Sequence, residues 1–147
     1  GFGIYLPLLL VAMQLVQVFI PSIDLNQQQQ IGFDDVSTGL QLSMVFVSLV
    51  VLPPITEEIL TRGFLYLGLK KSMKKIYAAL ITSVLFAIAH LQFGSNAPLL
   101  WSAAIDTFIL SGVLIYIRDV TGKLWAPIGL HMLKNFIAFL ALFVFTA

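Results

Sequence analysis

The amino-acid sequence predicts an all-α membrane protein, a polytopic bundle of about five transmembrane helices in one membrane domain over residues 1–147. Of these residues 59% are hydrophobic and only 10% are charged, whereas a soluble domain carries about 25% charged residues. The mean hydropathy is +0.99. Because so few charges cannot coat a particle of 16.2 kDa, most of the exterior is expected to face hydrocarbon. A water-soluble globule is excluded.

The first expected span covers residues 1–23, which carry no charge and are long enough to cross a core of about 30 Å. It lacks the basic start and the cleavage site of a signal peptide. Because position 1 is Gly rather than Met, we expect a processed or excised chain, and helices missing upstream are left open. The polar segment 21–37 is expected to form an exposed loop.

The second span starts near residue 36 and contains Pro53 and Pro54. Two consecutive prolines remove backbone donors, so we expect the helix to be kinked or broken after them. A helical pattern then continues to about Leu69 and ends in a basic patch at residues 70–75.

Three more spans follow, separated by turn-forming residues at 94–98 and 118–123. They cover residues 76–93, 99–117 and 124–145. The loops 70–75 and 118–123 hold six of the eight basic residues, whereas 21–37 and 94–98 hold none. By the positive-inside rule the basic loops and the N-terminus are expected to be cytoplasmic. This topology accounts for the basic residues, so no nucleic-acid partner is expected.

Seven ionisable residues lie inside the expected spans, where such groups usually pair or mark a functional site: Glu57, Glu58, Arg62, His90, Asp106, His131 and Lys134. Glu58 and Arg62 are four residues apart, which predicts a salt bridge. Asp106 and Lys134 lie at similar depths, about 17 Å from the turn at residues 118–123, and we expect them to be in contact. Glu57 points about 100° away from Glu58. It is left without a cationic partner.

The sequence contains no cysteine, which excludes thiol nucleophiles and thiolate metal sites. Glu57, His90 and Asn135 are expected at depths of about 18–23 Å from the basic surface, with His131 nearer to it. Such a group favours a hydrolytic site, because a desolvated carboxylate can take a proton from water. His131 and Asn135, four residues apart, can donate hydrogen bonds to an oxyanion. The alternative is that each only bonds a neighbouring helix.

Three motifs occur in order on separate expected spans: EEILTR at residues 57–62, FAIAH at 86–90 and HMLKN at 131–135. They resemble the EExxxR, FxxxH and HxxxN motifs of the CAAX protease and bacteriocin-processing family (CPBP, also called Abi), which includes the type II CAAX prenyl endopeptidases. The resemblance covers a core of about residues 40–145 and leaves the span 1–23 outside it.

The resemblance implies an intramembrane endopeptidase whose active site opens toward the cytoplasm. Glu57 and His90 would activate the water. His131 and Asn135 would form the oxyanion hole. The implied substrates are prenylated CAAX proteins or other membrane-associated peptides, met within the lipid of the membrane.

The same resemblance implies supporting roles for Glu58 and Arg62, which would hold the motif helix in place. Phe86 is either a packing aromatic or a substrate contact. Two other functions stay open: a non-catalytic immunity or scaffold protein of the same family, and a transporter whose buried charges relay protons. The transporter is disfavoured, because five spans without an internal repeat give little basis for alternating access.

A metal cofactor is not favoured by the sequence. The family is described both as metalloprotease-like and as glutamate-dependent, and the chain has no HExxH pair to place two zinc ligands on one helix turn. If zinc or another divalent metal is present, its ligands would be Glu57, His90 and His131.

Overall fold

The computed structural model describes residues 1–27, 32–33, 36, 38–93 and 98–145, and within these it contains helices and no strand. The elements are α1 (Phe2–Phe19), α2 (Gly39–Phe46), η1 (Val47–Val51), α3 (Leu52–Glu58), η2 (Ile59–Leu65), α4 (Tyr66–Ser72), α5 (Lys75–Ala89), α6 (Trp101–Thr121) and α7 (Trp125–Phe143). The predicted all-α helical membrane bundle is confirmed.

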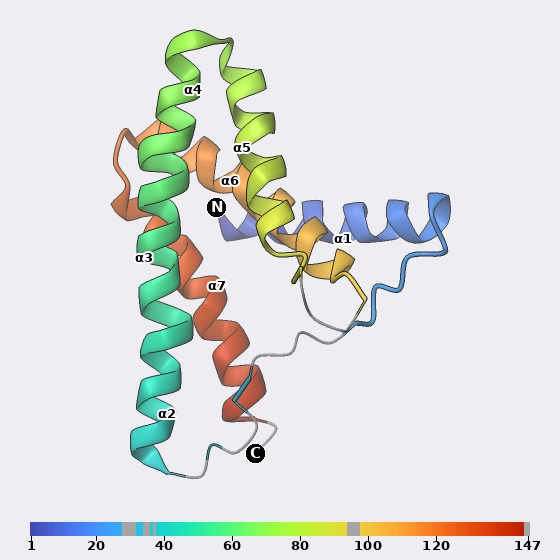
Figure 1. Ribbon diagram of the computed structural model, residues 1–147, viewed down its shortest axis with the longest axis vertical. Helices are drawn as coiled ribbons and strands as arrows, with labels where there is room; N and C mark the ends of the chain where they lie inside the picture. Colours follow the sequence, from blue (N-terminus) through green and yellow to red (C-terminus); the bar gives the residue numbers. More distant parts are fainter. Residues whose placement is uncertain (28–31, 34–35, 37, 94–97, 146–147) are drawn as a thin grey trace.

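The segments α2 to α4 join into one long helix, Gly39–Ser72 (Figure 1). A capping box starts it, because the Thr38 hydroxyl accepts from the Gln41 amide and the Gln41 side chain accepts from the Thr38 amide. Of the kink or break expected after Pro53 and Pro54, the break does not occur. The helical path continues through both prolines because a π-helical stretch, η1, precedes them, where the Leu52 amide bonds to the Val47 carbonyl five residues back.

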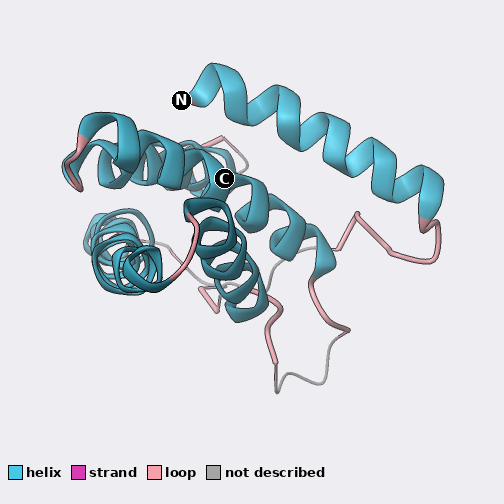
Figure 2. Ribbon diagram, turned by 90° about the horizontal axis from the view of Figure 1, so that it is seen from above, coloured by secondary structure: helices cyan, strands magenta, loops and turns pink. Residues whose placement is uncertain are grey.

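Helices α5 and α7 pack against this long helix, α6 packs on α5 and α7, and α1 packs on α6. The chain reverses after α4, so that α5 runs back beside it, and α5 packs along α6 with a buried hydrogen bond of 3.0 Å between Ser83 and Ser111. Helix α7 lies against η1 and α3. Helix α1 lies across the others rather than alongside the long helix, as Figures 1 and 2 show. It packs on α6 through Tyr5, Leu110 and Leu114.

Within the described residues, three helical segments are long and apolar enough to cross a membrane: α1, the long helix Gly39–Ser72 and α7. Helix α5 is apolar but has only 15 residues. Helix α6 has 21 residues and carries Asp106, Arg118 and Asp119. Large hydrophobic side chains such as Phe64 and Trp125 are more than 70% exposed. This surface suits a lipid environment.

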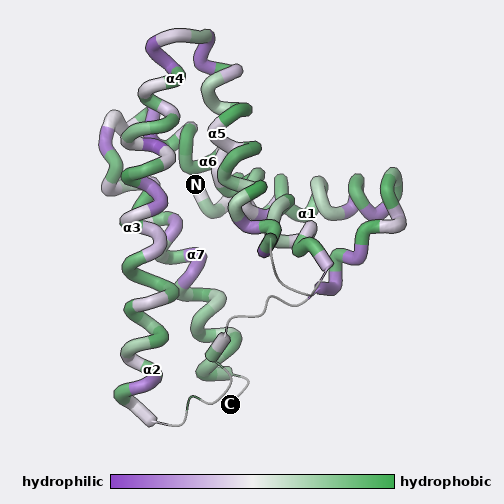
Figure 3. Tube along the Cα trace, viewed as in Figure 1, coloured by the Kyte–Doolittle hydropathy of each residue, from purple (hydrophilic) through white to green (hydrophobic). Residues whose placement is uncertain are grey.

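The two basic loops meet at one end of the molecule. Lys70 and Lys75 lie 2.7 and 2.8 Å from the carboxylate of Asp119, near the end of α6. Helix α6 ends at Gly122, whose left-handed φ of 68° favours glycine and whose amide bonds the Arg118 carbonyl. Figure 3 shows hydrophilic residues at the α4–α5 turn and in short stretches of α3 and α7.

Candidate active site

The ion pair between Glu58 and Arg62 anchors the motif helix. The Arg62 Nη1 and Glu58 Oε1 atoms are 2.9 Å apart, and both side chains are 0% exposed. The guanidinium also lies over the ring of Phe86, 4.5 Å from its centroid. The predicted salt bridge is confirmed. Because it occupies the arginine, Glu57 is left to face elsewhere.

Glu58 also holds His131, which comes from α7. The Nδ1 atom of His131 lies 3.0 Å from Glu58 Oε1, and its Nε2 atom lies 3.8 Å from Glu57 Oε2. An ionised carboxylate only accepts hydrogen bonds, so Nδ1 donates to Glu58. His131 is therefore fixed between the two glutamates, with Nε2 turned toward Glu57.

The side chain of Glu57 lines a cavity. Its side chain is 31% exposed, and its buried Oε2 atom has no hydrogen-bond partner among the described residues. It makes no ion pair with Arg62 in the described structure. The prediction that Glu57 lacks a Lys or Arg partner is confirmed for these residues.

His90 follows the last residue of α5, where the helix ends. Its Nδ1 atom lies 2.8 Å from the carbonyl oxygen of Phe86. Because a carbonyl cannot donate, Nδ1 carries the hydrogen, and the Nε2 atom of the neutral ring is an acceptor. His90 lines the same cavity as Glu57.

Asn135 is held by a backbone group of the long helix. Its Nδ2 atom donates to the carbonyl oxygen of Leu49 over 2.9 Å. Asn135 lies four residues after His131, so both side chains reach the cavity from one face of α7.

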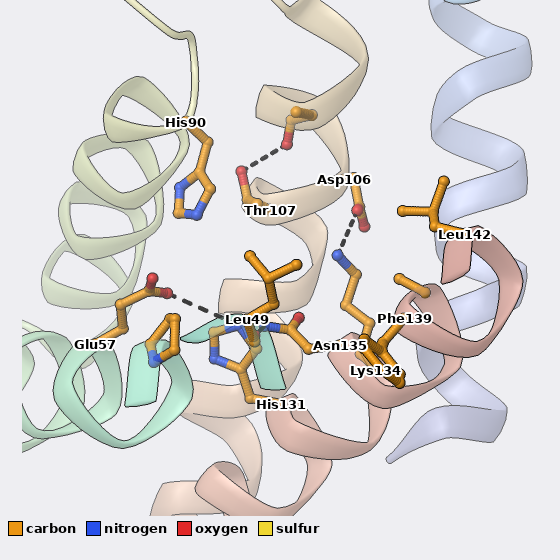
Figure 4. A pocket seen from close by; sticks show the side chains of 13 residues that line it. Leu49, Glu57, His90, Asp106, Thr107, His131, Lys134, Asn135, Phe139 and Leu142 are labelled. Atoms are coloured by element: carbon orange, nitrogen blue, oxygen red, sulfur yellow. Dashed lines mark hydrogen bonds and ion pairs between the residues drawn. The ribbon is translucent and has the colours of Figure 1, made fainter. Parts of the chain in front are cut away.

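A cavity of about 230 Å³ brings the predicted residues together (Figure 4). Its polar lining consists of Glu57, His90, Asp106, Thr107, His131, Lys134 and Asn135. The four residues to which the sequence assigns catalysis are thus neighbours; their roles stay predictions. A second, more apolar hollow of about 380 Å³ lies against η2 and α5, and Glu57 and His90 line it too.

Asp106 and Lys134 form the contact expected from their depths. The Lys134 Nζ and Asp106 Oδ2 atoms are 2.7 Å apart. The hydroxyl of Tyr5, from α1, donates to the other carboxylate oxygen. The sequence reasoning missed Tyr5, although a buried tyrosine in an uncharged span needs a polar partner for its hydroxyl. Through Tyr5, helix α1 reaches the cavity wall.

Phe86 packs inside the protein and is 4% exposed. Its ring contacts Arg62, and its centroid lies 4.7 Å from that of the His90 ring. Packing is therefore an observed role of Phe86. It also lines the second hollow, so a substrate contact there stays a prediction.

The described residues contain no group of three His, Asp or Glu side chains that is arranged to hold one metal ion. The set Glu57, His90 and His131 does not form such a group in the described structure. Metal dependence stays a prediction.

These features define a class: a helical membrane protein with a glutamate, two histidines and an asparagine around an internal cavity. Residues 39–137 match the family described as type II CAAX prenyl endopeptidase Rce1-like, and the chain belongs to this family. The family is one of CAAX-type intramembrane proteases.

A curated relative is the "Putative membrane peptidase YdiL" of Bacillus subtilis (strain 168). It is 35% identical over 92 residues, which are 63% of this chain and 34% of that protein. The chain thus aligns with about a third of the relative's length. No solved structure gives a significant match.

Proposed function

We propose that the protein is an intramembrane endopeptidase that hydrolyses peptide bonds of prenylated CAAX-type or other membrane-associated peptides. One observation carries the proposal: the carboxylate of Glu57, which has no Lys or Arg partner among the described residues, lies in a cavity that His90 and His131 share. An unneutralised acid is costly inside a membrane protein, and such residues mark functional sites.

In this mechanism Glu57 is the general base. A water molecule donates one hydrogen bond to Glu57 and another to the Nε2 atom of His90. Glu57 takes one proton as the water oxygen attacks the peptide carbonyl carbon, and the other hydrogen stays on that oxygen. When the C–N bond breaks, Glu57 returns its proton to the leaving amine. The products are a new carboxyl group and a free amine.

Asn135 and His131 supply the oxyanion donors. One N–H of the Asn135 amide is used by Leu49, which leaves the second for the oxyanion. His131 gives its Nδ1 hydrogen to Glu58. Its Nε2 atom donates only when the ring carries a second proton.

The catalytic type is glutamate-dependent, and no step passes through a metal. The bond from His90 Nδ1 to the Phe86 carbonyl suits the part of this ring in such a mechanism, because it leaves the Nε2 lone pair to accept from the water. We expect dialysis against a metal chelator, followed by assay in chelator, to leave the cleavage rate unchanged within about twofold. Loss of activity that zinc restores would contradict the glutamate type and favour zinc.

The basic end of the molecule faces the cytoplasm, and substrate enters from that side. Support comes from the contacts of Lys70 and Lys75 with Asp119, which join both basic loops at one end. Membrane lipid surrounds the helices, and the apolar hollow beside Glu57 suits an apolar part of the substrate.

A non-catalytic immunity or scaffold function is the second candidate. It is favoured by the structural use of two site residues, since His131 bonds Glu58 and Asn135 bonds the backbone of Leu49. These bonds would be kept for folding even without catalysis.

An assay of peptide cleavage by the purified protein distinguishes the peptidase function from the scaffold function. We expect Glu57→Gln and His90→Ala each to lower the rate by about 100-fold or more, with the fold retained. Asp24→Asn, the same change of a carboxylate to an amide in an exposed loop, is the control and should cleave normally. Unchanged cleavage in Glu57→Gln, or no cleavage by any form while biological activity persists in both variants, would favour the scaffold.

A further inference from the structure

The carbonyl group of Leu49 has no backbone donor in its own helix. An α-helical bond would come from residue 53 and a π-helical bond from residue 54. Both are prolines, which carry no N–H. The remaining neighbour, the Leu52 amide, bonds the Val47 carbonyl instead. The consecutive prolines therefore leave the Leu49 carbonyl as a free acceptor in the middle of a membrane-spanning helix.

The side-chain amide of Asn135, on α7, donates a hydrogen bond to this acceptor. Its Nδ2 atom lies 2.9 Å from the Leu49 oxygen, and the bond joins α7 to η1. Leu49, Pro53 and Asn135 all line the cavity that holds Glu57, and Figure 4 labels Leu49 and Asn135. A carbonyl within a membrane-spanning helix needs a hydrogen-bond partner, because leaving it unpaired costs free energy.

We propose that Pro53 and Pro54 are positioning residues for the site: by freeing the Leu49 carbonyl they fix the amide of Asn135 in its catalytic orientation. This inference rests on the proposed peptidase function. The amide uses one hydrogen for Leu49, so its plane is fixed before substrate arrives. The second hydrogen of the same nitrogen is then preorganised for the oxyanion, the condition under which such a donor is most effective.

The opposite reading is that the bond only ties two helices together. The two readings differ in what they expect when the helix regains a donor. Pro53→Ala supplies an N–H four residues after Leu49 and removes a proline from a helix, so it should not destabilise the long helix. If Asn135 is positioned by this carbonyl, the same variant should lose activity.

The activity test compares three single variants and one double variant of the full chain on one peptide. We expect Asn135→Ala to lower kcat by about 100-fold. Pro53→Ala should lower kcat by about 10-fold or more with KM nearly unchanged, because Asn135 loses its fixed partner. Pro7→Ala, which removes the proline inside α1, is the matched control and should keep kcat. In the double variant Pro53→Ala/Asn135→Ala, kcat should equal that of Asn135→Ala alone, since there is no amide left to position.

The stability test needs no activity. Asn135→Ala leaves the Leu49 carbonyl unpaired in the parent protein but not in Pro53→Ala, where the helix supplies a donor. Its loss of melting temperature should therefore be clearly smaller in the Pro53→Ala background. Equal losses in both backgrounds would overturn the hydrogen-bond account.

The two arms separate the ways of failing. If the parent protein cleaves no peptide, the proposed function fails, whereas coupling in the melting temperatures still supports the bond to Leu49. Coupling together with full kcat in Pro53→Ala would overturn the positioning role and leave the bond as a link between helices. If Pro53→Ala lowers kcat by the same factor with and without the Asn135 side chain, the positioning role is overturned as well.

Discussion

Glu58 is the residue on which the site geometry depends. One of its oxygens contacts both Arg62 at 2.9 Å and His131 at 3.0 Å, and its side chain is fully buried. Neighbouring Glu57 makes no ion pair with Arg62 in the described structure, lies 3.8 Å from His131 and is partly exposed to the cavity. Two adjacent carboxylates thus serve different purposes, because one helical step of about 100° separates their directions.

We predict that Glu58→Ala destabilises the protein much more than Glu57→Ala. Removing Glu58 leaves the Arg62 guanidinium buried without its counter-ion, which costs about 3 kcal/mol or more. Removing Glu57 breaks only the longer contact with His131. Thermal unfolding of both variants in the same detergent measures the difference. Equal melting temperatures would contradict the role of Glu58 as the counter-ion that stabilises the buried Arg62.

At the scale of single residues, local spacing was enough for some contacts. The salt bridge of Glu58 with Arg62 follows from a separation of four residues, and that of Lys134 with Asp106 from equal depth. The bond from Asn135 to Leu49 was not predicted, because a backbone acceptor leaves no mark in side-chain patterns. The signal that could have found it is the pair of prolines four and five residues after Leu49.

At the scale of elements, the π-helical stretches change where side chains lie. The sequence analysis placed His131 nearer the basic end than Glu57, yet their side chains are 3.8 Å apart. The depth estimate assumed a uniform α-helix from Glu57 to the basic patch. Seven of the intervening residues form η2, and a wider turn advances less along the axis per residue. Glu57 is therefore closer to the basic end than that estimate gave.

The basic end is also an element-scale feature, with Asp119 tying α6 to α4 and α5. Burial raises the pKa of Asp119, but hydrogen bonds from Lys70, Lys75 and Tyr66 lower it by more, to about 2. Its ordinary value is 3.8. Because the folded pKa is the lower one, this group stabilises the fold fully above about pH 4 and loses the contribution as the pH falls toward 2.

We therefore predict that Asp119→Asn lowers the melting temperature at pH 6 and removes part of the drop between pH 4 and pH 2. Circular dichroism melts across this range measure both effects. Asp24→Asn, in an exposed loop, is the control and should follow the parent curve. A drop of unchanged size in Asp119→Asn would mean that other carboxylates cause it.

At the scale of the whole molecule, composition and hydropathy predicted the fold class, since 10% charge leaves no alternative to a lipid-facing surface. They did not predict how the helices face one another. Helix α1 lies across the bundle and reaches Asp106 through Tyr5, a placement that depends on packing against α6 and not on periodicity. Which helix faces pack together depends on tertiary contacts that a single sequence does not reveal.

The central claim is that Glu57 activates a water molecule that attacks the peptide directly. Cleavage in water enriched in oxygen-18, with enzyme in excess so that each molecule turns over once, tests it. Mass spectrometry of the fragments should find one heavy oxygen in the new carboxyl group from the first turnover. An unlabelled first-turnover product, whose oxygen comes from a carboxylate of the protein, would contradict the claim.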